Sequence, residues 1–172
     1  MQIANSVILR EDFKNESIEK MREQDNKNII LFLDFDGVLH PVGTRTAGEK
    51  DFSKLPQLEA WLRANPIVSV VISSSWRDCM SLALLQQFFS ADLRSRIIDK
   101  CPILPFEPAP EFWRHAEIMA WIDQQQYRGK WLALDDAVDE FPPNFEQLII
   151  CDRAIGIDEC VINELTKRIL CD

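Results

Sequence analysis

The sequence lacks an apolar run long enough to cross a membrane. A spanning helix needs about 18 consecutive apolar residues, whereas Asp34 and Asp36 interrupt the first candidate and the serines at 73–75 close the second. The first residues also lack the basic and then apolar regions of a secretory signal. We therefore expect a cytoplasmic protein with no membrane partner.

Several cofactor-binding patterns are absent as well. The chain has five cysteines and two histidines but no C-x-x-C pair, which argues against structural zinc. It has no G-x-G, which excludes the dinucleotide-binding fingerprint. The stretch GTRTAGEK at 43–50 resembles a phosphate-binding loop, but Glu49 stands where that loop requires lysine.

Positive charge is scarce, with 19 Lys and Arg against 28 Asp and Glu and a net charge of −9. Because nucleic-acid affinity comes mainly from basic residues on phosphates, this balance counts against a long nucleic-acid footprint. The net charge does not exclude a local basic pocket. For each residue that is a candidate for such a pocket, the alternative is an ordinary surface charge. The candidates are Arg45, Lys50, Arg77 and Arg114, with Trp76 as a residue that either stacks on a base or belongs to the core.

Apolar residues are plentiful, at 47% of a 172-residue chain, which suits one domain with a substantial core. Residues 1–27 carry charge of both signs and are interpreted as an N-terminal appendage, with one helix at most. Residues 28–172 are predicted to form a single domain, in which apolar strands alternate with helices. Strands are expected at 29–33, 67–72, within 96–103, at 130–134 and at 147–151, and helices at 55–64, 79–89, 113–127 and 159–170. This alternation predicts an α/β fold with a mostly parallel sheet and helices on both faces.

Polar clusters follow three of these strands. The Asp34-Phe35-Asp36-Gly37 sequence follows the first, the serines at 73–75 the second, and Asp135-Asp136 the fourth. Because ligands bind at the carboxyl ends of parallel strands, these side chains are expected in one crevice.

The acids suit phosphate chemistry. If Gly37 bends the chain, Asp34 and Asp36 approach one centre, where one carboxylate attacks phosphorus and the other transfers protons. Two more acids, Asp135 and Asp136, would repel them unless a cation is bound, and oxygen ligands favour Mg²⁺. The alternatives are solvated acids at turns or a simple cation site.

Two further groups offer contacts to a phosphoryl group. Ser73 and Ser74 present hydroxyl and backbone N–H donors at the end of the second strand, although a turn or helix cap explains such serines equally well. Arg114, at the start of a predicted helix, has a guanidinium that suits phosphate or offsets the carboxylates, unless it is a surface arginine.

The motifs LFLDFDGVLHP, VVISSSWR and WLALDDA, with a basic residue opening a helix before the last, resemble the haloacid dehalogenase (HAD) superfamily of phosphohydrolases. Within it, the chain resembles the small HAD domain of Swiss Army Knife RNA repair proteins over about residues 28–170. The resemblance implies a Rossmann-like three-layer sandwich with a minimal cap or none. The loop at 101–112 is a candidate cover for the site.

The resemblance also implies roles. Asp34 would be the nucleophile and Asp36 the general acid/base, and the second motif and Arg114, which stands where the family usually has lysine, would bind the phosphoryl group. The implied phosphate ligands are thus Ser73, Ser74 and Arg114, and the implied Mg²⁺ ligands Asp34, Asp36 through its backbone carbonyl, Asp135 and Asp136.

These observations predict a Mg²⁺-dependent phosphohydrolase that cleaves a phosphate monoester through an aspartyl-phosphate, on a phosphorylated small molecule or nucleotide. The alternatives are a polynucleotide end-repair phosphatase, which would bind a nucleic-acid end, and a catalytically weak HAD-like binding or regulatory domain. The physiological substrate and the oligomeric state are left open by the sequence.

Overall fold

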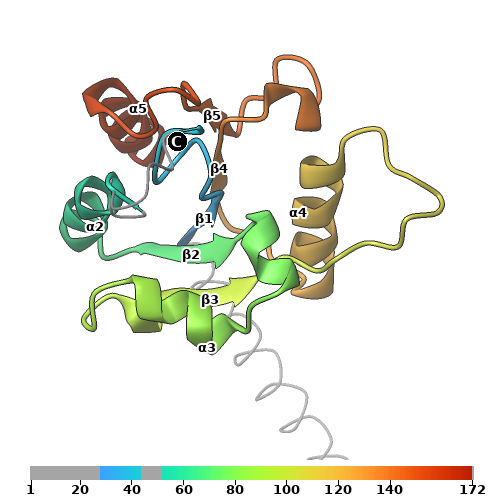
Figure 1. The fold of residues 1–172 in the computed structure, drawn as a ribbon, viewed down its shortest axis with the longest axis horizontal. Helices are drawn as coiled ribbons and strands as arrows, with labels where there is room; N and C mark the ends of the chain where they lie inside the picture. Colours follow the sequence, from blue (N-terminus) through green and yellow to red (C-terminus); the bar gives the residue numbers. More distant parts are fainter. Residues whose placement is uncertain (1–27, 44–51, 172) are drawn as a thin grey trace, which may run out of the picture.

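A computed structural model describes residues 28–43 and 52–171 (Figure 1). The predicted appendage at 1–27 lies outside the described residues, as do Arg45, Lys50 and Glu49. The boundary at residue 28 and the single-domain organisation therefore remain predictions.

Five parallel strands form one sheet in the order β3-β2-β1-β4-β5. The strands are β1 (Ile29–Leu33), β2 (Val68–Ile72), β3 (Ile97–Lys100), β4 (Trp131–Asp135) and β5 (Leu148–Ile150). Every residue of β1 is buried, because this central strand is covered on both faces, and its continuous apolar sequence is typical of such a position. The predicted α/β class and parallel sheet are confirmed.

Helices cover both faces of the sheet (Figure 1). On one face, α2 (Leu55–Ala64), α3 (Leu82–Leu85) and α5 (Glu159–Leu170) contribute buried side chains to a large core cluster, including Leu58, Leu85 and Leu165. On the other face, α4 (Trp113–Gln124) packs through Ile118, Trp121 and Ile122 in a second cluster. The result is the three-layer sandwich that the sequence predicts.

Two predicted helices differ from the structure. The segment expected to be helical at 79–89 contains only α3 and the 3₁₀ helix η2 (Gln86–Phe88), because Ser81 caps the start of α3 by accepting from Leu84 N. The 3₁₀ helix η1 (Ser75–Asp78) precedes this segment. Two more 3₁₀ helices, η3 (Arg94–Arg96) and η4 (Val138–Glu140), precede β3 and follow β4.

The other difference is the end of α4, which stops at Gln124 rather than at 127. Gln126 has a positive φ of 51°, and the chain turns there. The turn places the buried Tyr127 hydroxyl within hydrogen-bond distance of the Asn28 and Lys130 carbonyls, at 2.7 and 2.8 Å. A tertiary contact therefore ends the helix early.

The cap is minimal. Within 34–43 and 52–54, the described parts of the connection from β1 to α2, there is no helix or strand beyond an isolated bridge between Asp36 and His40. The loop at 101–112 projects outward beyond α4, away from the sheet (Figure 1), so the expectation that it covers the site is wrong. None of the described helices is long and apolar enough to span a membrane.

Candidate active site

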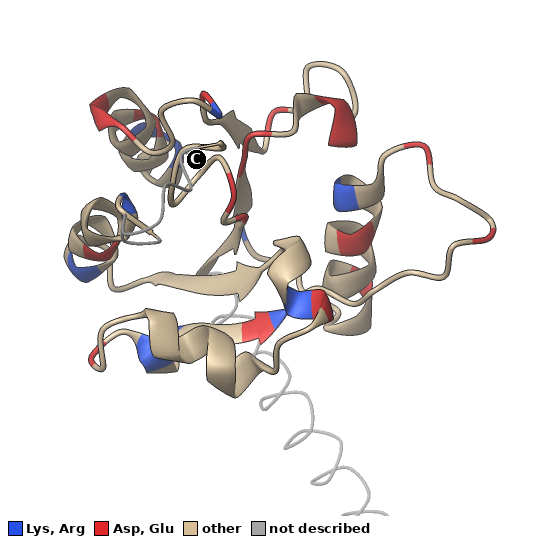
Figure 2. Ribbon diagram, in the orientation of Figure 1, with Lys and Arg blue, Asp and Glu red and all other residues tan. Residues whose placement is uncertain are grey.

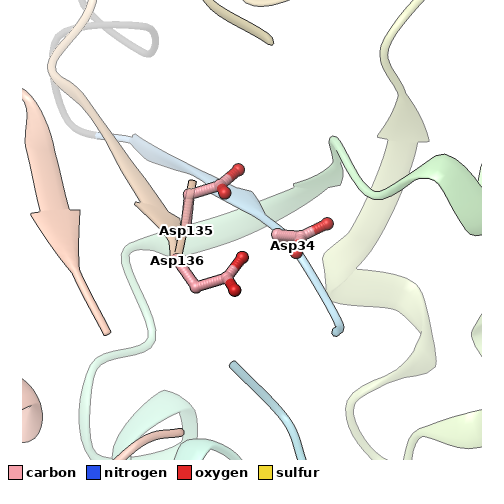
Figure 3. Close-up of side chains that lie close together, drawn as sticks. All are labelled: Asp34, Asp135 and Asp136. Carbon is pink, nitrogen blue, oxygen red and sulfur yellow. The ribbon is translucent and has the colours of Figure 1, made fainter. Parts of the chain in front are cut away.

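Adjacent strands bring three acids together. β1 and β4 pair in register, with Leu33 opposite Leu134, so Asp34 and Asp135 emerge side by side at their carboxyl ends. Oxygen atoms of Asp34, Asp135 and Asp136 all lie within 4.8 Å of one another, and Figure 3 shows the three carboxylates together. Asp34 and Asp135 are almost fully buried, at 4% and 1% exposure. The crevice predicted from the strand ends is therefore present.

Arg114 reaches this acid cluster from the first turn of α4. Its Nη2 lies 3.4 Å from Asp34 Oδ1 and its Nε 3.2 Å from Asp135 Oδ2. Figure 2 shows this basic first turn beside the acidic segments that follow β1 and β4. The alternative of a surface arginine is wrong, because the side chain is only 14% exposed.

Burial dominates the ionisation of the cluster. It raises the pKa of Asp34, an effect that Arg114 opposes. It raises the pKa of Asp135 to about 7, with the neighbouring Asp34 charge adding to the increase. Burial also raises the pKa of Asp136, which Arg153 opposes. Three acids facing one buried arginine leave a deficit of positive charge.

A divalent cation fits that deficit. The three acids supply an oxygen-only donor set, which suits Mg²⁺. Asp135 Oδ2 is buried and, beyond its ion contact with Arg114, has no hydrogen-bond donor among the described residues. The side chain of Asp36 lies outside the three-acid group.

Gly37 is required for this arrangement. Its φ is +73°, and a Cβ atom built there would lie 2.3 Å from Asp136 Oδ2. Glycine therefore permits both the bend after Asp36 and the close approach of Asp136. The sequence predicted the bend but not the contact.

Asp36 is held by two side chains. Its Oδ1 lies 2.9 Å from His40 Nε2, and its Oδ2 accepts a 2.8 Å hydrogen bond from Trp76 Nε1. Trp76 packs its ring against Phe35 and Phe88 in an aromatic cluster. The sequence anticipated a core or base-stacking role for Trp76 but missed the hydrogen bond, because a contact between residues forty positions apart leaves no local pattern.

The serines lie where β2 meets the acid cluster. The backbone N–H groups of Ser73 and Ser74 donate to the Leu33 carbonyl, at 3.0 and 3.3 Å, and both residues are buried. Ser74 precedes η1, but its side chain makes no capping hydrogen bond. The Ser74 hydroxyl is buried and has no hydrogen-bond partner among the described residues.

Arg77 is not available to a substrate. It is 3% exposed, donates from Nη1 to the Ser73 carbonyl, and pairs through Nη2 with Glu117 Oε2. The expectation of a phosphate contact or a surface charge at this position is wrong, since the side chain forms a buried link between η1 and α4.

A cavity of about 300 Å³ adjoins the acid cluster. Its lining residues are Asp36, His40, Pro41, Val42, Gly43, Asp136 and Arg153. Arg153 follows β5, and its Nε lies 3.4 Å from Asp136 Oδ2. No local pattern in the sequence identifies Arg153, because it belongs to no motif and enters the site only through the position of β5 beside β4.

One family model matches residues 30–161: the HAD domain in Swiss Army Knife RNA repair proteins. No curated protein and no solved structure matches the chain.

Proposed function

We propose that this chain, which belongs to the family of HAD domains in Swiss Army Knife RNA repair proteins, is a Mg²⁺-dependent phosphohydrolase acting on phosphate monoesters. HAD domains are in general hydrolases, most of them phosphatases, that use Mg²⁺. The observation that carries the proposal is the buried group of Asp34, Asp135 and Asp136 with Arg114 between two of them.

Asp34 acts as the nucleophile. One carboxylate oxygen attacks the phosphorus, the bond to the leaving alcohol breaks, and a phospho-aspartate forms at residue 34. Asp36 gives its proton to the leaving oxygen. It then takes a proton from the water that attacks the same phosphorus, which releases phosphate and restores the Asp34 carboxylate.

The surroundings of Asp36 support this role. His40 and Trp76 each occupy one of its carboxylate oxygens, so the group is held at the edge of the cavity rather than free to rotate. Positioned acid–base groups are more effective than mobile ones.

Asp34, Asp135 and Asp136, with the Asp36 carbonyl, would hold the metal, which when bound supplies positive charge against the carboxylates and the phosphoryl oxygens. Arg114 contributes a second, permanent positive charge at Asp34 and Asp135. The backbone N–H groups of Ser73 and Ser74 donate to the Leu33 carbonyl, so this segment would offer its side-chain hydroxyls to the phosphoryl oxygens.

A polynucleotide end is the second candidate substrate. The family belongs to RNA repair proteins, and the minimal cap leaves the site open to a large substrate. The net charge of −9 opposes a long footprint but not contacts to one terminal nucleotide. A catalytically weak binding domain is the third candidate, since Arg114 keeps the charge of the lysine usual at that position but not its shape.

The test is phosphate release with Mg²⁺ or EDTA. The substrates are p-nitrophenyl phosphate, sugar phosphates, mononucleotides, and oligonucleotides with a 3′- or 5′-phosphate. We expect metal-dependent release, reduced at least a thousandfold in Asp34→Asn because the amide is not a nucleophile. The matched control is Asp139→Asn, at an exposed acid in η4 outside the cavity lining.

Substantial turnover by Asp34→Asn would remove Asp34 as the nucleophile. If the wild-type protein releases phosphate from none of the substrates while calorimetry shows that it binds Mg²⁺, the binding-domain alternative is supported.

A further inference from the structure

The cavity beside the acid cluster has a rigid wall that the catalytic proposal does not use. Arg153 lies in the turn after β5, and its carbonyl accepts from Val42 N at 2.8 Å. The same turn is closed by Asp152, whose Oδ1 accepts from Ala154 N at 2.8 Å. A second backbone hydrogen bond, from Ile157 N to the Val38 carbonyl at 2.9 Å, connects the chain after this turn to the loop after β1. The backbone of Arg153 is therefore held at the cavity.

The side chain of Arg153 remains available. It is 70% exposed, and within the described residues its guanidinium has no hydrogen bond and no ion pair other than the 3.4 Å contact from Nε to Asp136. An ion pair this exposed contributes little free energy and is easily exchanged. Both terminal nitrogens can bind an anion in the planar, two-point geometry that suits phosphate.

Arg153 is the one cation among the residues that line the cavity, as far as the described chain goes. The two acids of the lining, Asp36 and Asp136, belong to the catalytic centre. Because Asp36 protonates the leaving oxygen in the proposed function, the leaving group extends from Asp36 into this cavity. An anionic leaving group would meet Arg153 there.

We propose that Arg153 is a specificity-determining residue that binds a second phosphate, carried by the leaving group of the substrate. This inference rests on the proposed function and narrows its substrate class. The favoured substrates are phosphate monoesters of an alcohol that is itself phosphorylated, as in a nucleoside bisphosphate or the phosphorylated end of a polynucleotide.

The experiment compares substrates that differ by one phosphate. Values of kcat/KM are measured for nucleoside 3′- and 5′-monophosphates, the nucleoside 3′,5′-bisphosphate, and a dinucleotide with a terminal phosphate. We expect the wild-type protein to prefer the substrates with two phosphates by about tenfold, as for one charge-assisted contact. In Arg153→Gln this preference should fall below about twofold, with the loss in KM rather than kcat.

Two variants serve as comparisons. Arg153→Lys keeps the charge but not the two-point geometry and should retain part of the preference. Arg128→Gln, at an exposed arginine that precedes β4 at the opposite edge of the sheet, should retain all of it. Far-UV circular dichroism and a Mg²⁺ titration of each variant separate lost recognition from a disturbed fold or metal site.

The outcomes distinguish the two proposals. If the wild-type protein hydrolyses monophosphates and p-nitrophenyl phosphate without preferring a second phosphate, or if Arg153→Gln keeps the preference, the inference on Arg153 is wrong and the phosphatase proposal stands. A preference for the dinucleotide over the bisphosphate identifies a polynucleotide end, and the reverse identifies a free nucleotide. If no substrate is hydrolysed, both proposals fail.

Discussion

At the scale of single residues, the electrostatics of the site depend on Arg114. Its guanidinium lies between Asp34 and Asp135, which are both buried. It opposes the increase that burial produces in the pKa of each acid. Arg114 therefore favours the ionised form of the proposed nucleophile.

Replacing Arg114 tests this dependence. We expect Arg114→Met to lower kcat/KM by about a hundredfold, the usual loss when one preorganised charge is removed from an active site. Its pH–rate profile should also move to higher pH, because Asp34 then ionises less readily. Arg114→Lys keeps the charge and should retain more activity than the methionine variant.

The matched control is Arg128→Met, which removes an exposed arginine at the other edge of the sheet. An Arg114→Met variant with the wild-type rate and pH profile would show that the ion contacts have no part in catalysis.

At the scale of elements, the ion pair between Arg77 and Glu117 joins η1 to α4. Arg77 also binds the Ser73 carbonyl, and Glu117 lies one helical turn after Arg114. Lys100, at the end of β3, donates from Nζ to the carbonyls of Arg77 and Met80, at 2.7 and 3.0 Å. These contacts fix the serine segment relative to the helix that carries Arg114.

Breaking this pair should cost stability. We expect Glu117→Gln to lower the free energy of unfolding by about 3 kcal/mol, because Arg77 is then left buried without its counter-charge. The double variant Arg77→Met, Glu117→Leu should recover much of the loss, since it removes both charges. Urea unfolding of the two variants measures the difference.

The control is Glu164→Gln, which removes the ion pairs of Glu164 with Lys167 and Arg168 on the surface of α5. It should change the free energy of unfolding by less than about 1 kcal/mol. A Glu117→Gln variant as stable as this control would contradict the structural role of the buried pair.

At the scale of the whole molecule, the buried acids set how stability depends on pH. Asp135 has an ordinary pKa of 3.8 in the unfolded chain and about 7 in the folded protein. Between these values the folded protein keeps a proton that the unfolded chain has lost. Stability in the absence of metal therefore falls as the pH rises from about 4 to 7, by up to about 1.4 kcal/mol per pH unit for one proton.

The measurement is urea unfolding in EDTA from pH 4.5 to 7.5, for the wild-type protein and Asp135→Asn. His115 acts in the opposite direction, because burial lowers its pKa, so the difference between the two proteins is the quantity of interest. We expect the wild-type protein to lose stability relative to the variant as the pH rises, and Mg²⁺ to restore it most at the upper end. Parallel curves would refute the raised pKa of Asp135.

Local patterns in the sequence determined the elements and the chemistry that they present. An apolar run of five residues identified β1, and Asp158 identified the start of α5, where its carboxylate accepts from Val161 N. The acids at the ends of the first and fourth predicted strands indicated one crevice. Strand periodicity and capping depend on neighbours in the chain, which is why the sequence alone reveals them.

Tertiary structure decided which residues meet at that crevice. The sequence allowed Arg114 to be a surface residue and Arg77 to be a substrate contact, whereas the packing of α4 placed the first against the acids and buried the second. The bond from Trp76 to Asp36 and the place of Arg153 depend on segments far apart in the chain. Such contacts arise from strand order and helix packing, which no local pattern encodes.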